Sequence, residues 1–352
     1  MRKKVVLLRS ESDRDHLLWL EALSSRNFPL DVDVVEVFSE SQWSQLITNL
    51  EGVVAVVARP SGVRQDFKRW YDERLSILSL HRDLIIYPSL TEVLIYENKK
   101  FLSDWLVFNK IPSPKTWVFY SLTEYKDFCE ACNFPLVAKT NIGASGKGVQ
   151  IIKSKAALKE YGYKAFNSGI ISRRGPNLFK GNLFKKIKKV FGIRNFISIR
   201  IKEYAQSYQE VQKGFVLIQE FIEHDFEWRC VRIGDSFFAH KKMKKGEKTS
   251  GTLIKEYSTP PESLLDFLYE ITNQRSLHSV AIDLFVRGES YLVNEIQCYF
   301  GQSDPHQMII DNIPGRYRRI NEQWVFESGS FNEFESHGAR VDHLLNLIKE
   351  RI

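Results

Sequence analysis

The sequence contains no long apolar run and few cysteines. Among its 352 residues the amino-terminal apolar stretch Val5–Leu8 covers only four positions, whereas a secretory signal needs roughly 7–15 apolar residues. No run approaches the ~18 apolar residues of a membrane-spanning helix. We therefore expect a folded cytoplasmic protein and no transmembrane segment.

The 4 cysteines include one CxxC pair, Cys129 and Cys132, in the helix-like segment LTEYKDFCEACNFP. A structural zinc site needs four ligands, and the sequence offers no second cysteine pair and no histidine cluster. We therefore interpret these cysteines as helix-packing residues rather than as redox or zinc-binding residues.

The chain carries a net charge of +7. A basic balance favours anionic partners, namely nucleotides, anionic sugars, acidic peptides or phospholipid surfaces, without choosing among them. The usual helix and RNP signatures of nucleic-acid binding are missing, so a nucleic-acid partner is not expected. The length allows two or three domains.

Short apolar runs alternate with helical patterns from residue 1 to residue 90, which predicts an α/β domain with a parallel sheet. Its strand ends, Arg9-Ser10 and Arg59–Ser61, lie where such sheets place ligand loops. Two mixed α+β subdomains are predicted to follow, over residues 91–222 and 223–352.

A basic stretch interrupts this order at residues 167–214. Lys and Arg alternate there with Phe and Ile, most densely over 180–202. Such a segment binds an anionic membrane or polysaccharide in some proteins, and in others it is a solvated insertion. The sequence leaves both interpretations open.

The glycine-rich stretch KTNIGASGKGV lies between two predicted strands, FPLVAKT and GVQIIKS. Walker and GxGxxG loops both lead into a helix, so this loop is neither. A strand–loop–strand hairpin can close over phosphates as a flap whose glycines let backbone N–H groups approach closely. The alternative is an ordinary hairpin turn. Lys139 ends the strand before this loop, and Lys99 begins a predicted helix; both could neutralise phosphates.

An apolar strand turns abruptly acidic in FVLIQEFIEHDFEWR. The backbone of Gln219, Glu220, Phe221 and Ile222 is a candidate for reading adenine. Glu223 or Asp225 would then contact ribose hydroxyls. The alternative is a buried strand that meets a polar turn.

Two carboxylates occupy paired strands of the predicted hairpin AIDLFVRGESYLVNEIQ. Alternation places Tyr291, Val293, Glu295 and Gln297 on one face of the second strand and Asn294 on the other, with Asp283 on the partner strand. Asp283, Glu295 and the Gln297 amide oxygen form a set of hard oxygen ligands suited to Mg²⁺. The alternative is a structural hydrogen-bond network.

Taken in order, these motifs resemble the ATP-grasp superfamily of carboxylate–amine ligases. The likeness covers roughly residues 90–300. Within it, EWRCVRIGD followed by HKKMKK looks most like the branch that adds glutamate to peptides and proteins. The residues that carry it are Asn98-Lys99, PLVAKT, 143–149, QEFI, Glu227–Arg229, Asp283, Glu295 and Gln297.

The resemblance implies an ATP-grasp fold and ATP with Mg²⁺, or Mn²⁺, as cofactors. Arg229 and Lys241 would be the catalytic residues facing the γ-phosphate or acyl intermediate, and Asp283, Glu295 and Gln297 would hold the metal. Gln297 stands where the family usually has Asn. Nucleotide would be bound by Lys99, Lys139, Gly143, Ala144, Ser145, Gly146, Lys147, Gly148, Gln219, Glu220, Phe221, Ile222, Glu223 and Asp225.

The implied function is an ADP-forming ligase that joins a small or polymer-linked carboxylate to an amine. The departure at Gln297 and the basic insertion keep a second hypothesis open, namely an ATP-binding scaffold or sensor that has lost ligation. A nucleic-acid-binding role for 180–202 ranks below both.

Overall fold

The computed structural model describes residues 3–11, 16–62, 64–143, 148–171, 211–245, 248–249, 254–300 and 304–351. The chain divides into two compact units. The first holds residues 1–61, 67–114 and 222–352, and the second holds 62–66 and 115–221. The predicted domain boundaries after residues 90 and 222 are not tested by this division and stay predictions.

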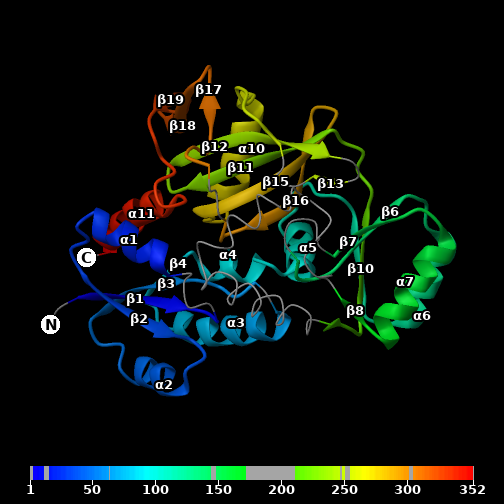
Figure 1. Cartoon of the computed structure of the whole chain (residues 1–352), viewed down its shortest axis with the longest axis horizontal. Coiled ribbons are helices and arrows are strands. Elements are labelled where there is room, and N and C mark those ends of the chain that lie inside the picture. The colour runs from blue at the N-terminus through cyan, green and yellow to red at the C-terminus, as the bar shows by residue number, and fades with distance from the viewer. Residues whose placement is uncertain are drawn as a thin grey trace, which may run out of the picture. The chain divides into compact units, whose positions relative to one another are not determined.

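The first unit begins with the predicted parallel sheet, whose strand order is β2-β1-β3-β4. Short helices connect its strands (Figure 1). The elements are β1 Lys4–Arg9, α1 Leu17–Ser25, β2 Asp31–Glu36, α2 Glu40–Thr48, β3 Val53–Ala58, α3 Gln65–Ser79 and β4 Ile85–Tyr87.

Alternate residues of β1 enter two different cores, because successive side chains of a strand point to opposite faces. Val6 and Leu8 pack with buried side chains of α3. Val5 and Leu7 pack with α1 and with α11, the carboxy-terminal helix His337–Arg351. Burial on both faces explains why the strand reads as one continuous apolar run.

The rest of this unit is an antiparallel sheet with the order β16-β15-β11-β12-β18-β17. The predicted carboxylate hairpin is β15–β16; the strands after it were not predicted. The bounds are β11 Phe226–Ile233, β12 Ser236–Lys245, β13 Lys248–Thr249, β14 Lys255–Glu256, β15 Ser279–Arg287, β16 Ser290–Gln297, β17 Ile309–Ile310, β18 Ile313–Ile320 and β19 Gln323–Ser328. Helices α4 Leu90–Ile95, α5 Lys99–Phe108 and α10 Glu262–Asn273 belong to the same unit.

The two faces of this antiparallel sheet differ. One face, with Trp228, Ile282 and Val293 among its residues, forms an apolar core with α5 and α10. We call it the helix-covered face. The opposite face carries Arg229 and Asp283 together with smaller apolar clusters, and we call it the polar face. The strand residues of the candidate site in this unit lie on one or the other of these two faces.

The second unit is a four-stranded antiparallel sheet, β5-β10-β6-β7, with two helices. Cys129 is buried against this sheet as a free thiol, in agreement with the predicted packing role. The bounds are β5 Thr116–Phe119, α6 Leu122–Ala131, β6 Leu136–Lys139, β7 Val149–Ile152, α7 Lys155–Asn167 and β10 Val216–Glu220.

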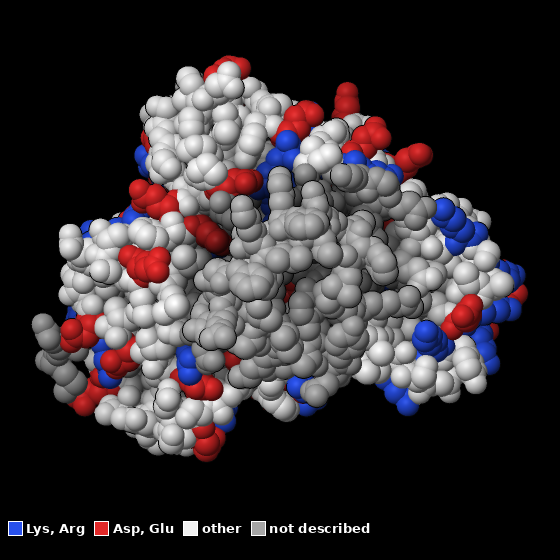
Figure 2. Space-filling model, viewed as in Figure 1, with Lys and Arg blue, Asp and Glu red and all other residues white. Residues whose placement is uncertain are grey.

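Of the basic stretch 167–214, only the two ends are described. Strand β8, Ile170–Ile171, pairs with β9, Val211–Gln212, while 180–202 lies outside the described residues. None of the helices in the described part of the chain is long and apolar enough to cross a membrane. On the described surface shown in Figure 2, basic side chains are interspersed with acidic ones.

Candidate functional site

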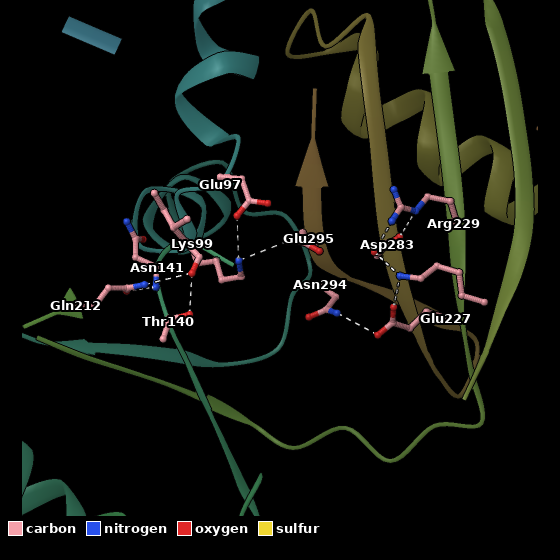
Figure 3. A network of polar contacts seen from close by, with 12 residues as sticks. Glu97, Lys99, Thr140, Asn141, Gln212, Glu227, Arg229, Asp283, Asn294 and Glu295 are labelled. Carbon is pink, nitrogen blue, oxygen red and sulfur yellow. Dashed lines mark hydrogen bonds and ion pairs between the residues drawn. The ribbon is translucent and has the colours of Figure 1, made fainter. Parts of the chain in front are cut away.

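Lys99 occupies the first position of α5, as predicted. The Asn98 side chain caps this helix by accepting a hydrogen bond from the Phe101 N–H at 3.4 Å. The Lys99 ammonium lies 3.6 Å from Glu295 Oε1 and 3.9 Å from Glu97 Oε2 (Figure 3). A lysine at a helix amino terminus adds its charge to the positive end of the helix dipole. The two carboxylates balance that charge here, and an anion could do so in their place.

Three charged residues form a row across the polar face. Arg229 on β11 is the register partner of Asp283 on β15, and Asp283 is the register partner of Glu295 on β16. Arg229 Nε lies 2.6 Å from Asp283 Oδ1. The row therefore runs from the Arg229 cation on β11 through Asp283 on β15 to Glu295 on β16, all on one face. The predicted pairing of Asp283 with Glu295 is confirmed.

Asp283 is a buried carboxylate between two cations. Lys242 Nζ donates to Asp283 Oδ2 at 2.6 Å and to Glu227 Oε2 at 2.9 Å. Burial by itself would raise the pKa of Asp283, but the charges of Arg229 and Lys242 lower it below its ordinary value. Asp283 is therefore ionised at neutral pH. Its Oδ1 forms an ion pair with Arg229 but no hydrogen bond.

The structure corrects the position of Lys241. Lys241 is the partner of Trp228 in the β11–β12 register, so it lies on the helix-covered face. There it pairs with Glu256 at 2.8 Å and lies 4.9 Å from the Phe226 ring centroid. Lys242, one residue later, occupies the polar face instead. Consecutive lysines in a sequence do not indicate which of them lies on the same sheet face as Arg229, because that depends on the strand register.

A β-bulge corrects the predicted alternation of β16. The register shifts between Asp283 and Leu284, which pair with Glu295 and Val293, so Asn294 is the extra residue. Val293 therefore lies on the helix-covered face, away from Glu295. Asn294 Nδ2 donates to Glu227 Oε1 at 3.2 Å, which places Asn294 beside the row (Figure 3). Bulges break strict alternation in this way and often lie at functional sites.

Gln297 follows Glu295 on the polar face. Its register partner is Ala281, two residues before Asp283 on β15, and its side chain is half-buried. Glu227, Lys242 and Asn294, to which the sequence analysis gave no role at the site, join this polar network: Lys242 donates to both Asp283 and Glu227, and Asn294 donates to Glu227. Alternation of Glu227 with Arg229 along β11 was a sequence signal for Glu227; Lys242 and Asn294 had none.

The glycine loop joins β6 to β7 in the second unit, as predicted. Lys139 is the last residue of β6, and the Thr140 N–H donates to the Gly148 carbonyl at 2.9 Å. Gly148 has φ +78°, a left-handed conformation that glycine adopts at little cost. The loop is therefore closed at its base by a glycine; residues 144–147 lie outside the described residues.

The base of this loop is stabilised by buried polar contacts. Thr140 donates its hydroxyl to the Ile142 carbonyl at 2.8 Å, and Gln212 Nε2 donates to the same carbonyl at 3.2 Å. The Asn141 N–H also donates to the Gln212 side chain. These contacts fix how the chain enters the loop at Gly143.

The predicted adenine segment begins on a strand and continues beyond it. Gln219 and Glu220 end β10, and the Glu220 side chain accepts a hydrogen bond from the Lys115 N–H at 2.9 Å. In the first unit, Ile222 forms a small apolar cluster with Phe285 and Leu292 on the polar face. Phe221, Glu223 and Asp225 fall between strands β10 and β11. Contact of any of them with a nucleotide stays a prediction.

Solved structures resemble the whole chain. A RimK domain ATP-grasp protein from Sphaerobacter thermophilus is 15% identical, with 97% of this chain and 99% of that chain covered and a TM-score of 0.50. The D-alanine–D-alanine ligase of Bacillus anthracis is 12% identical, with 99% and 100% covered and a TM-score of 0.50. The chain has the ATP-grasp fold.

A third ATP-grasp neighbour was solved with nucleotide. The biotin carboxylase domain of the 2-oxoglutarate carboxylase from Hydrogenobacter thermophilus, in complex with MgADP, is 10% identical, with 87% of this chain and 66% of that chain covered and a TM-score of 0.51. No protein-family model matches the chain, and no curated protein sequence matches it. At these identities the likeness shows the fold alone, and activity has to be argued from the site.

A divalent cation fits the chemistry of this candidate site only together with phosphate oxygens. Within the described residues, no group of three or more His, Cys, Asp or Glu residues is arranged to hold a metal. The polar face offers Asp283 and Glu295 as register partners, with the Gln297 amide two residues further on. Mg²⁺ is commonly bound through one or two carboxylates plus substrate phosphates, so two carboxylates suffice.

Proposed function

We propose that this protein is an ATP-dependent carboxylate–amine ligase that forms an amide or peptide bond through an acyl phosphate and releases ADP. The observation that supports it most is the row Arg229, Asp283 and Glu295 on one sheet face, with Lys99 against Glu295. Two cations and two carboxylates at this spacing suit a triphosphate whose charge is shared with Mg²⁺.

The proposed reaction has two steps. An oxygen of the acid substrate attacks the γ-phosphorus of ATP, and the bond to the β,γ-bridging oxygen breaks, so that ADP leaves with the electron pair. The amine nitrogen then attacks the acyl carbon, the carbon–oxygen bond to phosphate breaks, and inorganic phosphate leaves as the nitrogen loses a proton. The protein forms no covalent bond, so its work is positioning and charge neutralisation.

In this proposal the residues of the first unit divide that work. Arg229 and Lys242 would neutralise the transferred phosphoryl group, because each of these cations lies 2.6 Å from the buried Asp283 carboxylate. Lys242 takes the place that the sequence assigned to Lys241. Asp283, Glu295 and Gln297 would hold Mg²⁺, or Mn²⁺, which neutralises phosphate charge when bound.

Nucleotide binding completes the proposal. The apolar cluster of Ile222, Phe285 and Leu292 offers a surface for the adenine ring, with Glu223 or Asp225 at the ribose. Lys139 and the glycine loop 143–148 would contact phosphates as a flap that keeps water from the acyl phosphate. A cytoplasmic location, oligomer formation and contact of 180–202 with a membrane or polysaccharide stay predictions.

The substitution Glu295→Ala tests this proposal. We expect it to lower ADP formation at least a hundredfold, since it removes one of two metal-binding carboxylates. The Glu295 side chain is 24% exposed, and its partner Lys99 lies 3.6 Å away. The free energy of unfolding should therefore change by about 1 kcal/mol or less. ADP release measured over a panel of acids and amines, each alone and in pairs, gives the readout.

Glu289→Ala, in the turn of the same hairpin, is the matched control and should leave ADP formation unchanged. Undiminished ADP formation by Glu295→Ala would refute the metal assignment. ATP binding without ADP formation for any acid and amine pair would favour the scaffold hypothesis over the ligase.

A further inference from the structure

A second cationic cluster in the first unit lies apart from the row on the polar face. Arg340, in the first turn of α11, is only 1% exposed. Its Nε donates to the Ser279 hydroxyl at 3.2 Å, whereas its Nη1 and Nη2 are buried without a hydrogen-bond partner among the described residues. A guanidinium has five N–H donors, and four of these belong to the two unpartnered nitrogens.

Two guanidinium groups lie over the rings of two consecutive aromatic residues. The Arg340 guanidinium carbon lies 4.4 Å from the centroid of the Phe300 ring, and that of Arg59 lies 3.3 Å from the centroid of Tyr299. Arg59 follows β3 at the carboxyl edge of the parallel sheet, which is the edge where open α/β sheets bind ligands. We call Arg59, Arg340, Tyr299 and Phe300 the arginine pair site.

The groups around Arg340 bring little compensating negative charge. Burial lowers the pKa of His337 to about 3, so this histidine is neutral at pH 7. Burial also raises the pKa values of Tyr87 and Cys298, which keeps both groups uncharged. Each of these three residues therefore leaves the positive charge of the site unchanged.

The buried carboxylate of Glu92 lies nearby, but it already accepts hydrogen bonds from backbone N–H groups. Glu92 accepts hydrogen bonds from the N–H groups of Ser279 and Ser89, at 2.6 Å each. Arg340 itself forms no ion pair with an Asp or Glu side chain of the described part of the chain. A buried charge without a counter-ion is strongly unfavourable. Among the described residues, Arg340 therefore lacks a counter-ion.

The position of the site relates it to the polar face. Ser279, which accepts a hydrogen bond from Arg340, is four residues before Asp283 on β15. Residues separated by an even number along a strand share a face, so Ser279 and Asp283 lie on the same face. Four residues of strand span roughly 13 Å, so Ser279 lies about that far along β15 from Asp283.

We propose that Arg340, together with Arg59, binds an oxyanion at the far end of the acid substrate, either a carboxylate or a phosphate. Two guanidinium nitrogens that point the same way match the two oxygens of either group. The identity of the ligand as the acid substrate rests on the proposed ligase function; the presence of an anion site does not. The substrate class is then an acid that carries a second anionic group.

Thermal unfolding with anionic probes tests the proposal. The probes are inorganic phosphate and glutarate, each compared with chloride at matched ionic strength and in saturating MgADP to fill the nucleotide site. We expect at least one probe to raise the Tm of the wild-type protein, and the probe that binds more tightly in calorimetry distinguishes a distal phosphate from a distal carboxylate. No rise beyond that of chloride for either probe overturns the proposal.

Two variants assign the effect to Arg340. Arg340→Met should abolish the anion-dependent rise in Tm, and without anion its Tm should equal or exceed that of the wild type, because an unpaired buried charge is removed. Arg340→Lys keeps the charge but loses the fork, so the probe should bind roughly tenfold or more weakly. A wild-type response in either variant overturns the proposal, and Arg340→Lys decides should Arg340→Met not fold.

The result is separable from the proposed ligase function. Glu295→Ala should keep the full anion response, since Glu295 lies on the polar face and not at the arginine pair site. An Arg340-dependent response in a protein that never forms ADP would support the anion site and refute the ligase. ADP formation without any Arg340-dependent response would support the ligase and refute the anion site.

Discussion

Substitution of two adjacent lysines, one at a time, tests which of them lies on the polar face. Lys242 is buried between Glu227 and Asp283, at 2.9 and 2.6 Å, and its side chain is 6% exposed. Its neighbour Lys241 lies on the opposite face, 23% exposed, and pairs with Glu256, which is 47% exposed. The two residues have the same chemistry and adjacent positions, so a Met substitution at each is a matched pair.

Lys242→Met removes the lysine that lies between two buried carboxylates, Glu227 and Asp283, and so weakens the charge balance of both. Removal of one partner from a buried ion pair destabilises by about 3–5 kcal/mol. Lys241→Met removes a half-exposed pair and a contact with an aromatic ring, each worth up to about 1 kcal/mol. Urea unfolding should therefore show a midpoint lower by roughly 1–2 M for Lys242→Met and a much smaller change for Lys241→Met.

A second substitution checks the cause. Glu227→Gln removes one of the two carboxylate charges that contact Lys242, so the double variant Lys242→Met with Glu227→Gln should recover about 1–2 kcal/mol of the loss, as measured by a double-mutant cycle. ADP formation should also fall in Lys242→Met and persist in Lys241→Met. A loss of stability in Lys241→Met as large as that in Lys242→Met would refute the assignment of the two faces.

Two further predictions concern acid stability and the glycine loop. Burial lowers the pKa values of His240 and His337 to about 3. Each histidine therefore stabilises the folded state at pH values above its unfolded pKa of about 6.5, and that stabilisation is lost as the pH falls toward 3. The free energy of unfolding at pH 5 should be about 2 kcal/mol lower per histidine than at pH 7, and an unchanged value in urea titrations would contradict this. Gly148→Ala should open the base of the loop, because Gly148 has φ +78° and an added Cβ would meet the Thr140 side chain; unchanged amide-exchange protection of Thr140 would refute this.

Much of the fold could be predicted from local patterns. The continuous apolar runs of β1 and β3 indicated a parallel sheet buried on both faces, and apolar segments such as 5–8 are buried as expected. The position of the glycine loop between two strands followed from short-range sequence alone, as did Lys99 at a helix start. Each of these depends on residues close together in the chain.

The candidate site was only partly predictable. Asp283 and Glu295 face each other because one short turn fixes the hairpin, which is a local feature. The strands after this hairpin were missed, and so was the bulge at Asn294. No sequence signal marks a single extra residue in an apolar strand, since its effect appears only when the partner strand is in place.

The sequence by itself determined many of the helices and strands before residue 300, and that carboxylates stand opposite each other on one hairpin. Only the tertiary structure decided that Lys242 and not Lys241 contacts Asp283, and that Arg340 is buried without a carboxylate partner among the described residues. The physical reason is that strand register and helix packing join residues far apart in the chain. A shift of one position reverses the face on which every side chain of a strand lies.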